Sequence, residues 1–231
     1  TLQNMQDASK LLDTHLNSSV LRIQDFKRVS PRQTYESPLY INLKEHLQQV
    51  VHTLQHTPKY QHIAFALNIQ EEVSLYTYPN VWTQIVNEWV SNSFLHGLSN
   101  VEAPVIHLQL ESFQAEAYQG IQALLNLMDH RLETEEGQEQ NAHADKNGRP
   151  LWRLTYTDNG SGIQEDIKPI IFEPFSTRSK SLFSGLGLYM VYNLVHQKLN
   201  GEIHILTSPD LEGGGFEIVF PHTQAPETKP L

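Results

Sequence analysis

The chain has 231 residues, of which 39% are hydrophobic, and a chain of this size can bury one core with a smaller appendage beside it. The absence of cysteine excludes disulfides, thiolate zinc sites and cysteine nucleophiles. A formal charge of −10 argues against binding to a nucleic-acid backbone, which requires a basic face, so nucleic acid is not an expected partner.

A long amphipathic helix is predicted over residues 2–27. Its apolar or small side chains recur every three or four positions, which is the spacing of a helix-packing seam. The seam consists of Met5, Ala8, Leu12, Leu16, Ser19, Ile23 and Phe26, and Pro31 ends the helix. An ordinary surface helix is one interpretation. A helix of a dimeric bundle is the favoured one, because the seam continues without a break.

A second amphipathic helix is predicted over 42–55, followed by a strand over 63–69. His52 and His56 lie four residues apart on this helix and could hold a metal, but without a further ligand nearby a solvated face is the favoured interpretation. Residues 73–77 are expected to form a strand that pairs with 63–69. The helix is expected to bury Leu43, Leu47, Val50, Val51 and Leu54.

The remaining elements mix helices with strands. A helix is predicted over 81–95, and another over 188–199 that is capped by Asn200 and Gly201. The apolar face of the first consists of Trp82, Ile85, Val86, Trp89 and Val90, and strands are predicted over 105–111, 151–157, 202–206 and 216–220. This order predicts an α+β fold, a two-layer α/β sandwich with a mixed sheet packed on helices, preceded by the long N-terminal helix.

Residues 113–150 are predicted to be an insertion between two strands. An amphipathic helix over 117–132 is expected to dock on the sandwich or on a partner through Tyr118, Ile121, Leu125 and Met128. The stretch 133–147 is polar and acidic, which is typical of flexible chain. Residues 223–231 are expected to form a disordered tail.

Three polar side chains share one face of the helix predicted over 81–95. Glu88, Asn92 and His96 follow each other at intervals of four residues, so each lies one turn beyond the last. A carboxylate and an amide so placed can hold Mg²⁺, and the carboxylate can also accept a proton or orient a nucleophile. Taken alone, the triple is better explained as the solvated face of a helix, and it becomes informative only together with other motifs.

Two glycine-containing segments adjoin predicted strands and helices. Asp158-Asn-Gly-Ser-Gly162 follows a strand and is either a tight turn or a base-binding loop, in which Asp158 accepts a hydrogen bond from an amine such as adenine N6. Gly160 and Gly162 would then let the backbone approach the base. Ser184-Gly-Leu-Gly-Leu188 opens a helix, where free N–H groups and the helix dipole can cradle phosphates. It is not a Walker A loop, because the Gly-Lys-Ser/Thr ending is missing.

The order and spacing of these segments resemble the GHKL superfamily, and within it the catalytic domain of bacterial sensor histidine kinases. Residues 84–93 resemble the N box, 158–163 the G1 box, 172–175 (Phe-Glu-Pro-Phe) the F box and 185–188 the G2 box of that family. The resemblance covers about residues 40–222 and implies the Bergerat ATP-binding fold.

The resemblance implies ATP and Mg²⁺ as cofactors and gives each matching residue a role. Asn92 would be the Mg²⁺ ligand, Glu88 the polar or basic residue beside the γ-phosphate and a second metal contact, and Asp158 the adenine reader. Residues 176–184 would form a mobile lid. The implied catalytic residues are Glu88 and Asn92, and the implied nucleotide-binding residues are Asn92, His96, Asp158, Gly160, Gly162, Ile163, Phe175, Thr177, Arg178, Lys180, Ser184, Gly185, Leu186, Gly187 and Leu188.

The same resemblance implies the organisation of the chain and its partners. Residues 1–30 would be part of the dimerisation and histidine-phosphotransfer hairpin, 31–222 the catalytic domain and 223–231 the tail. The family's phosphoacceptor box, a His followed by an acid and a Pro, is absent, and His15 is a poor candidate. The acceptor histidine is therefore expected on a helix of the parent kinase upstream of Thr1, with a response regulator as a further partner and a homodimer formed through the N-terminal helix.

The expected location is the cytoplasm, in a parent kinase attached to the inner membrane. No apolar run in the chain is long enough to cross a bilayer, and the start at Thr1 suggests a fragment of a longer protein.

Three positions depart from the family pattern and keep alternatives open. Leu95 stands where many relatives have a phosphate-contacting Lys, Phe183 replaces a glycine expected before Ser184, and Gly214 or Gly215 takes the place of an adenine-binding Thr. One alternative is a GHKL ATPase or an anti-sigma-type serine kinase, against which the N-terminal seam argues. Another is a degenerate domain that acts as a dimeric interaction module.

Overall fold

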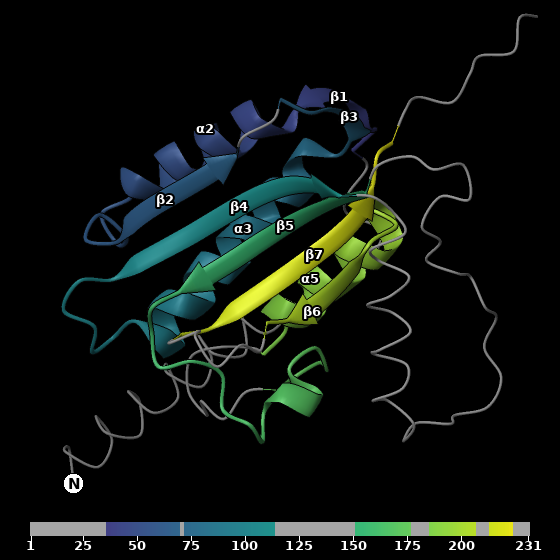
Figure 1. Cartoon of the computed structure of the whole chain (residues 1–231). Coiled ribbons are helices and arrows are strands. Elements are labelled where there is room, and N and C mark those ends of the chain that lie inside the picture. The colour runs from purple at the N-terminus through teal and green to yellow at the C-terminus, as the bar shows by residue number, and fades with distance from the viewer. Residues whose placement is uncertain (1–35, 70–71, 114–150, 177–184, 207–212, 224–231) are drawn as a thin grey trace, which may run out of the picture. The chain divides into compact units, whose positions relative to one another are not determined.

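The computed structural model describes residues 36–69, 72–113, 151–176, 185–206 and 213–223 (Figure 1). Contacts divide the chain into two compact units, Ser37–Ile163 with Asn193–Leu231 and Thr1–Glu36 with Gln164–Tyr192. The predicted seam helix over 2–27, His15, most of the predicted insertion and nearly all of the predicted tail lie outside the described residues.

The larger unit is built on a mixed five-stranded sheet in the order β2-β4-β5-β7-β6 (Figure 1). Its strands are β2 (Ala64–Ile69), β4 (Val105–Phe113), β5 (Leu151–Asp158), β6 (Glu202–Ile205) and β7 (Gly215–Pro221). The pair β2 and β4 is parallel, and the three other pairs are antiparallel. All five strands lie where the sequence predicted strands, so the predicted mixed sheet of an α+β fold is confirmed.

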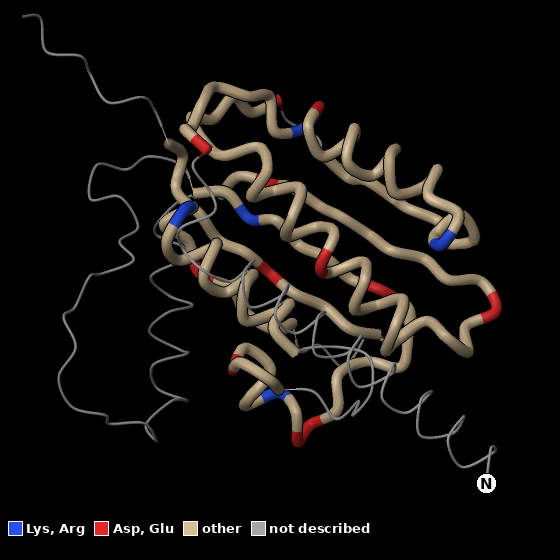
Figure 2. Tube along the Cα trace, turned by 180° about the vertical axis from the view of Figure 1, so that it is seen from behind, with Lys and Arg blue, Asp and Glu red and all other residues tan. Residues whose placement is uncertain are grey.

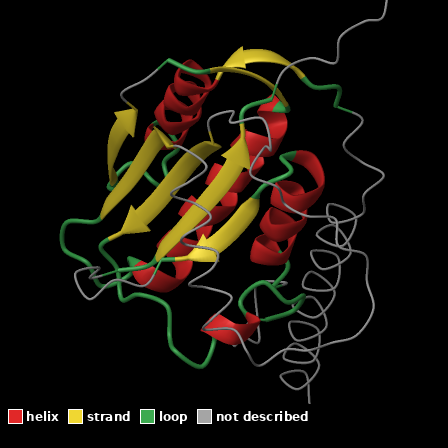
Figure 3. Ribbon diagram, turned by 45° about the vertical axis from the view of Figure 1, so that its right-hand side comes forward, coloured by secondary structure: helices red, strands yellow, loops and turns green. Residues whose placement is uncertain are grey.

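Two helices of this unit lie on one side of the sheet (Figure 3). In α2 (Leu43–Gln55), all five residues predicted to face inward are buried, and the side chain of Asn42 caps the start by accepting the N–H of Glu45 at 3.3 Å. Pro79 opens α3 (Pro79–Asn92), whose predicted apolar face is fully buried. None of the helices in the described segments combines the length and apolar character that crossing a bilayer requires.

The core of the unit lies between α3 and the central strands. The ring of Trp89 lies 5.2 Å from that of Tyr156 and 5.9 Å from that of Phe216, measured between centroids. Because side chains alternate along a strand, every second residue of β5 from Trp152 faces the helices, and Asp158 ends this series. The register of β5 therefore turns a carboxylate toward the helix layer at the end of the strand.

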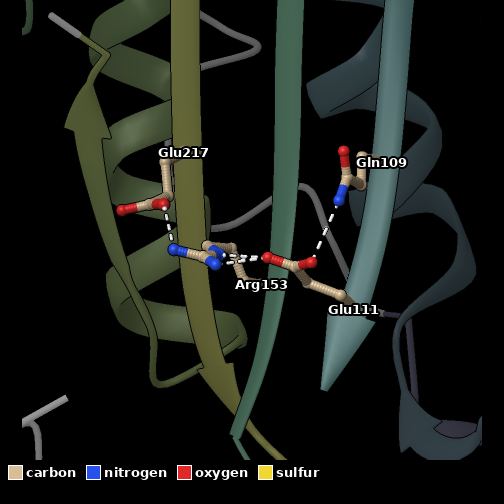
Figure 4. A network of polar contacts seen from close by, with 4 residues as sticks. All are labelled: Gln109, Glu111, Arg153 and Glu217. Atoms are coloured by element: carbon tan, nitrogen blue, oxygen red, sulfur yellow. Dashed lines mark hydrogen bonds and ion pairs between the residues drawn. The ribbon is translucent and has the colours of Figure 1, made fainter. Parts of the chain in front are cut away.

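The opposite face of β5 carries a polar network (Figure 4). The Nε of Arg153 donates to Glu111 on β4 at 2.8 Å, its Nη2 donates to the same carboxylate, and its Nη1 lies 3.3 Å from Glu217 on β7. Gln109 donates to the second oxygen of Glu111 at 2.9 Å. These half-exposed groups link three neighbouring strands, although exposed ion pairs contribute only about 0–1 kcal/mol each.

The strand at residues 73–77 does not pair with the strand at 63–69, so that prediction was wrong. That strand, β3 (Ser74–Thr77), pairs antiparallel with β1 (Leu39–Asn42) in a separate two-stranded sheet, while β2 pairs with β4. The strand β1 has four residues and leads directly into the capping residue of α2, so it offers too short a pattern to be recognised.

The helix α5 (Gly187–Lys198) ends as the sequence predicted. Asn200 adopts a left-handed φ of 49°, and the N–H of Gly201 donates to the carbonyl of Val195 at 3.1 Å. A Cβ at Gly201 would lie 2.5 Å from the carbonyl oxygen of Val219, so only glycine lets the chain pass this close to β7.

Candidate functional site

A buried carboxylate lies at the centre of the candidate site. Asp158 is 7% exposed, and its Oδ1 accepts the N–H groups of Gly160 at 2.8 Å and Gly214 at 3.0 Å. Its Oδ2 accepts the hydroxyl of Ser93. All three donors are neutral, and within the described segments no cation forms an ion pair with Asp158. An ionised carboxylate offers about four acceptor positions, so about one position is left for a ligand.

Ser93 was not among the residues that the sequence analysis selected. It is 6% exposed and receives a second hydrogen bond, from the hydroxyl of Tyr156 at 2.7 Å. Burial raises the pKa of Tyr156 well above its ordinary value, so the phenol keeps its proton at neutral pH. The signal that could have identified Ser93 is its position four residues after Trp89, where a hydroxyl interrupts the apolar face of the helix.

A π-helical turn connects α3 to this site. In η2 (Ser93–Gly97) the N–H of Leu98 reaches back five residues, to the carbonyl of Ser93, at 2.8 Å. The prediction that His96 follows Asn92 by one regular α-helical turn was therefore wrong, because the π turn inserts an extra residue. His96 is exposed at this turn, but partial burial of its imidazole disfavours the charged form and lowers its pKa.

The loop after β5 packs directly on the π turn. The N–H of Ser161 donates to the carbonyl of Gly97 at 3.1 Å, and a Cβ at Gly160 would lie 2.7 Å from the carbonyl carbon of Gly97. The side chain of Asn159 anchors the loop to the start of β4 by accepting the N–H of Val105 at 2.8 Å. The predicted close approach at Gly160 thus serves backbone packing on the π turn.

A third segment closes around Asp158 from the start of β7. The N–H of Asp158 donates to the carbonyl of Gly214 at 2.9 Å, and a Cβ at Gly213 would lie only 1.8 Å from the carbonyl oxygen of Asp158. Gly162, with a φ of 74°, approaches the carbonyl of Gly213, and Ile163 lies beside Gly214. Gly213 was missed by the sequence analysis, because only the fold brings it against β5.

The two other predicted residues of this unit lie on α3. Asn92 ends the helix, and its Nδ2 is buried with no hydrogen-bond partner among the described residues. Glu88 lies one turn earlier and is half-buried. Because buried polar atoms normally have partners, the amide of Asn92 is a group that a bound ligand can satisfy.

The cations next to α3 and the π turn come from other segments, since Lys59 Nζ lies 4.8 Å from the ring centroid of Phe94 and Lys198 Nζ lies 5.1 Å from that of Tyr78. Residues 72–113, which are all described, contain no lysine or arginine (Figure 2). The described residues also contain no group of three or more His, Asp or Glu that could hold a metal by itself. His52 and His56 are exposed, with Nδ1 of His56 2.7 Å from the carbonyl of His52. Mg²⁺ needs only one or two protein ligands when phosphates and water complete its shell.

The other predicted residues belong to the smaller unit or are not described. Within the smaller unit, the N–H of Phe175 donates to the carbonyl of Gly185 at 3.0 Å, and both residues have a φ of 66°. Phe175 is 61% exposed, whereas Leu186 is buried. Gly187 and Leu188 form the first turn of α5. Thr177, Arg178, Lys180 and Ser184, together with Phe183, lie outside the described residues.

The sequence of residues 115–226 matches the family model described as histidine kinase-, DNA gyrase B-, and HSP90-like ATPase. The match includes Asp158 and the segment from Phe172 to Leu188, and it begins after α3. No curated protein matches the chain.

Solved structures of sensor kinases share the fold. The mycobacterial sensor histidine kinase MprB is 16% identical, with a TM-score of 0.53, and the match covers 81% of this chain and 99% of that one. A nucleotide-free catalytic domain of the histidine kinase ThkA is 18% identical, with a TM-score of 0.54 and coverages of 82% and 99%. Full-length ShkA, solved in complex with AMPPNP, is 17% identical, with a TM-score of 0.58 and coverages of 96% and 39%.

Replacing Gly213 by alanine is expected to destabilise the protein by about 1–3 kcal/mol, because the new methyl group would overlap the carbonyl oxygen of Asp158. Gly97→Ala is the matched control, since its Cβ would meet nothing closer than 3.5 Å, and its stability should stay within about 1 kcal/mol of the parent. Urea unfolding of the parent protein and the two variants measures the difference. Equal midpoints for all three would show that Gly213 does not pack against the carbonyl of Asp158 as described.

Proposed function

We propose that the chain is the ATP-binding catalytic part of a sensor histidine kinase, since residues 115–226 match the family model of histidine kinase-, DNA gyrase B- and HSP90-like ATPases. It would bind ATP with Mg²⁺ and transfer the γ-phosphoryl group to a histidine outside this chain. The fold shared with the catalytic domain of ThkA and with MprB supports the proposal.

The observation that carries the proposal is the environment of Asp158. Burying a carboxylate among neutral donors is costly, and a fold gains little from it unless the charge has a use. Its unfilled acceptor position suits the exocyclic amine of adenine, which is a donor only. Gly162 and Ile163 would line the base, and Gly160 and Gly214 would hold the carboxylate in place.

The phosphate end of the nucleotide would be bound by two groups of residues. Asn92, and Glu88 directly or through water, would hold Mg²⁺, which neutralises phosphate charge when bound. The metal would be bound by Oδ1 of Asn92, while its partnerless Nδ2 would donate a hydrogen bond to a phosphate oxygen. Gly185, Leu186, Gly187 and Leu188 would offer free N–H groups at the start of α5 to the phosphates.

The remaining contacts would come from side chains that the sequence analysis selected. Arg178 and Lys180 would supply cations that residues 72–113 lack, with Thr177, Ser184, Phe175 and His96 completing the nucleotide site. In the transfer, the bond from the γ-phosphorus to an imidazole nitrogen forms as the bond to the leaving ADP oxygen breaks. Glu88 would orient the imidazole or accept its proton.

The proposed organisation follows from this function. Residues 1–30 would be the second helix of the dimerisation and phosphotransfer hairpin and would form a homodimer, and residues 31–222 would be the catalytic domain. The phosphoacceptor helix of the parent kinase and a response regulator would be its partners. The site would work in the cytoplasm, where ATP is available, with the parent attached to the membrane.

One observation favours a second candidate function, a domain that binds nucleotide without transferring phosphate. Leu95 is half-buried on the π turn at the position where many relatives have Lys, and residues 72–113 contain no lysine or arginine. Without a cation there, binding of the phosphates would depend on Mg²⁺ and on residues elsewhere in the chain.

Asp158→Asn is expected to weaken ATP binding about 10- to 150-fold, the worth of a hydrogen bond to a charged group. An amide presents a donor where the carboxylate accepts, so the adenine amine or one of the three donors already bonded to Asp158 would be left unpaired. Calorimetric titration with ATP and Mg²⁺ measures the loss, with the exposed Glu102→Gln as a control expected to bind like the parent. Unchanged affinity in a folded Asp158→Asn protein would remove Asp158 from the nucleotide site.

Phosphotransfer is tested by mixing the chain with labelled ATP, Mg²⁺ and a polypeptide that carries the upstream helix. The proposal predicts label on that polypeptide that is stable to base and labile to acid, and loss of labelling when Mg²⁺ is chelated or Asn92 is changed to alanine. Base-labile phosphoserine would favour the serine kinase, and ATP binding without labelling would favour the second candidate function. Absence of nucleotide binding would leave only an interaction module.

A further inference from the structure

Two buried hydroxyl groups form a chain of hydrogen bonds that ends at the carboxylate of Asp158. The hydroxyl of Tyr156 donates to Ser93 Oγ at 2.7 Å, and the hydroxyl of Ser93 donates to Asp158 Oδ2. Tyr156 is fully buried, and Ser93 is 6% exposed. Burying hydroxyls costs free energy even when they are bonded, and phenylalanine and alanine would fill the same core without that cost.

The direction of the two hydrogen bonds is fixed by chemistry. A serine hydroxyl has one proton, and an ionised carboxylate can only accept, so the proton of Ser93 must point to Oδ2. Ser93 Oγ is then free to accept the proton of Tyr156, which the phenol retains. No rotation of either hydroxyl satisfies all three groups in another way.

The other oxygen of Asp158 has no capacity left. Oδ1 accepts two backbone N–H groups, from Gly160 and Gly214. With Ser93 on Oδ2, three of about four acceptor positions are filled, and the last one belongs to Oδ2. Backbone donors hold Oδ1 whatever the side chains are, and Ser93 is the donor that the described residues supply to Oδ2.

We infer that Ser93, supported by Tyr156, is a positioning residue that presents one acceptor position of Asp158 Oδ2 and thereby restricts the site to bases with an amine there. The inference rests on the proposed function, because it assumes that Asp158 contacts the base. Adenine offers the N–H, whereas hypoxanthine and guanine offer a carbonyl oxygen that would face the carboxylate unpaired. A site built around a hydrogen bond rejects a ligand that cannot make it.

Removing the hydroxyl of Ser93 should therefore alter selectivity and not only stability. Asp158 would be held through Oδ1 alone and could turn about its terminal torsion, so the bond to the adenine amine would weaken. A base that never made that bond would lose little. A purely structural role for Ser93 would instead lower the affinity of all nucleotides together, or lower only the stability.

The test compares the dissociation constants of ATP and inosine triphosphate, each with Mg²⁺, by calorimetry. Ser93→Ala should narrow the preference for ATP about tenfold, mainly through weaker ATP binding. Tyr156→Phe keeps Ser93 and removes only the hydrogen bond that Tyr156 donates to it. This variant should narrow the preference for ATP over inosine triphosphate less, about threefold. Ser93→Thr, which keeps a hydroxyl, should retain the preference.

Controls separate the possible failures. Thr155→Val removes a hydroxyl from the opposite face of β5 and should leave both constants unchanged. If the parent protein prefers ATP but Ser93→Ala and Tyr156→Phe keep its ratio of constants, the inference is overturned and the proposed function stands. If the parent protein binds neither nucleotide, or binds both equally, the proposed role of Asp158 fails and the inference fails with it. Urea unfolding shows which variants are folded, and Tyr156→Phe alone decides the question if Ser93→Ala does not fold.

Discussion

A charge buried without a counter-charge is the constraint on which the arrangement of this site depends. The carboxylate of Asp158 is satisfied by a serine hydroxyl and two backbone N–H groups, and each donor comes from a different segment. The π turn supplies Ser93, the loop after β5 supplies Gly160, and the start of β7 supplies Gly214. Because every donor must approach within hydrogen-bonding distance, glycines are needed where backbones meet, and Gly213 has the least room among the described glycines.

Periodicity predicted most of the fold correctly, because the helices and strands of this chain bury one face each. The apolar positions of α2 and α3 and all five strands of the sheet followed from local spacing. The pairing of β3 with β1 could not be predicted in this way, because β1 is too short for a pattern and pairing depends on long-range contacts. The π turn, Ser93 and Gly213 were missed for a related reason. Their importance lies in contacts with residues more than fifty positions away.

The predicted nucleotide residues divide between two settings. Asp158, Gly160, Gly162 and Ile163 come together around one carboxylate in the larger unit, where the base-reading chemistry would lie. Gly185 to Leu188 span the start of α5 at Gly187, where phosphates would be bound, and the cations proposed for them lie at Arg178 and Lys180 in the sequence. Base recognition would thus depend on buried contacts, whereas charge neutralisation would depend on Mg²⁺ and on the segment after Phe175. The two tasks can fail separately, so nucleotide binding and phosphotransfer need separate tests.

Amide resonances of the isotopically labelled chain offer the most direct measurement of the central claim, that Asp158 reads the base. The N–H groups of Gly160 and Gly214 are bonded to the carboxylate that would receive the adenine amine, so they report on that contact. Their resonances should move when ATP and Mg²⁺ are added and stay in place with tripolyphosphate and Mg²⁺. Resonances that remain unmoved at saturating ATP, while others in the chain shift, would contradict the account.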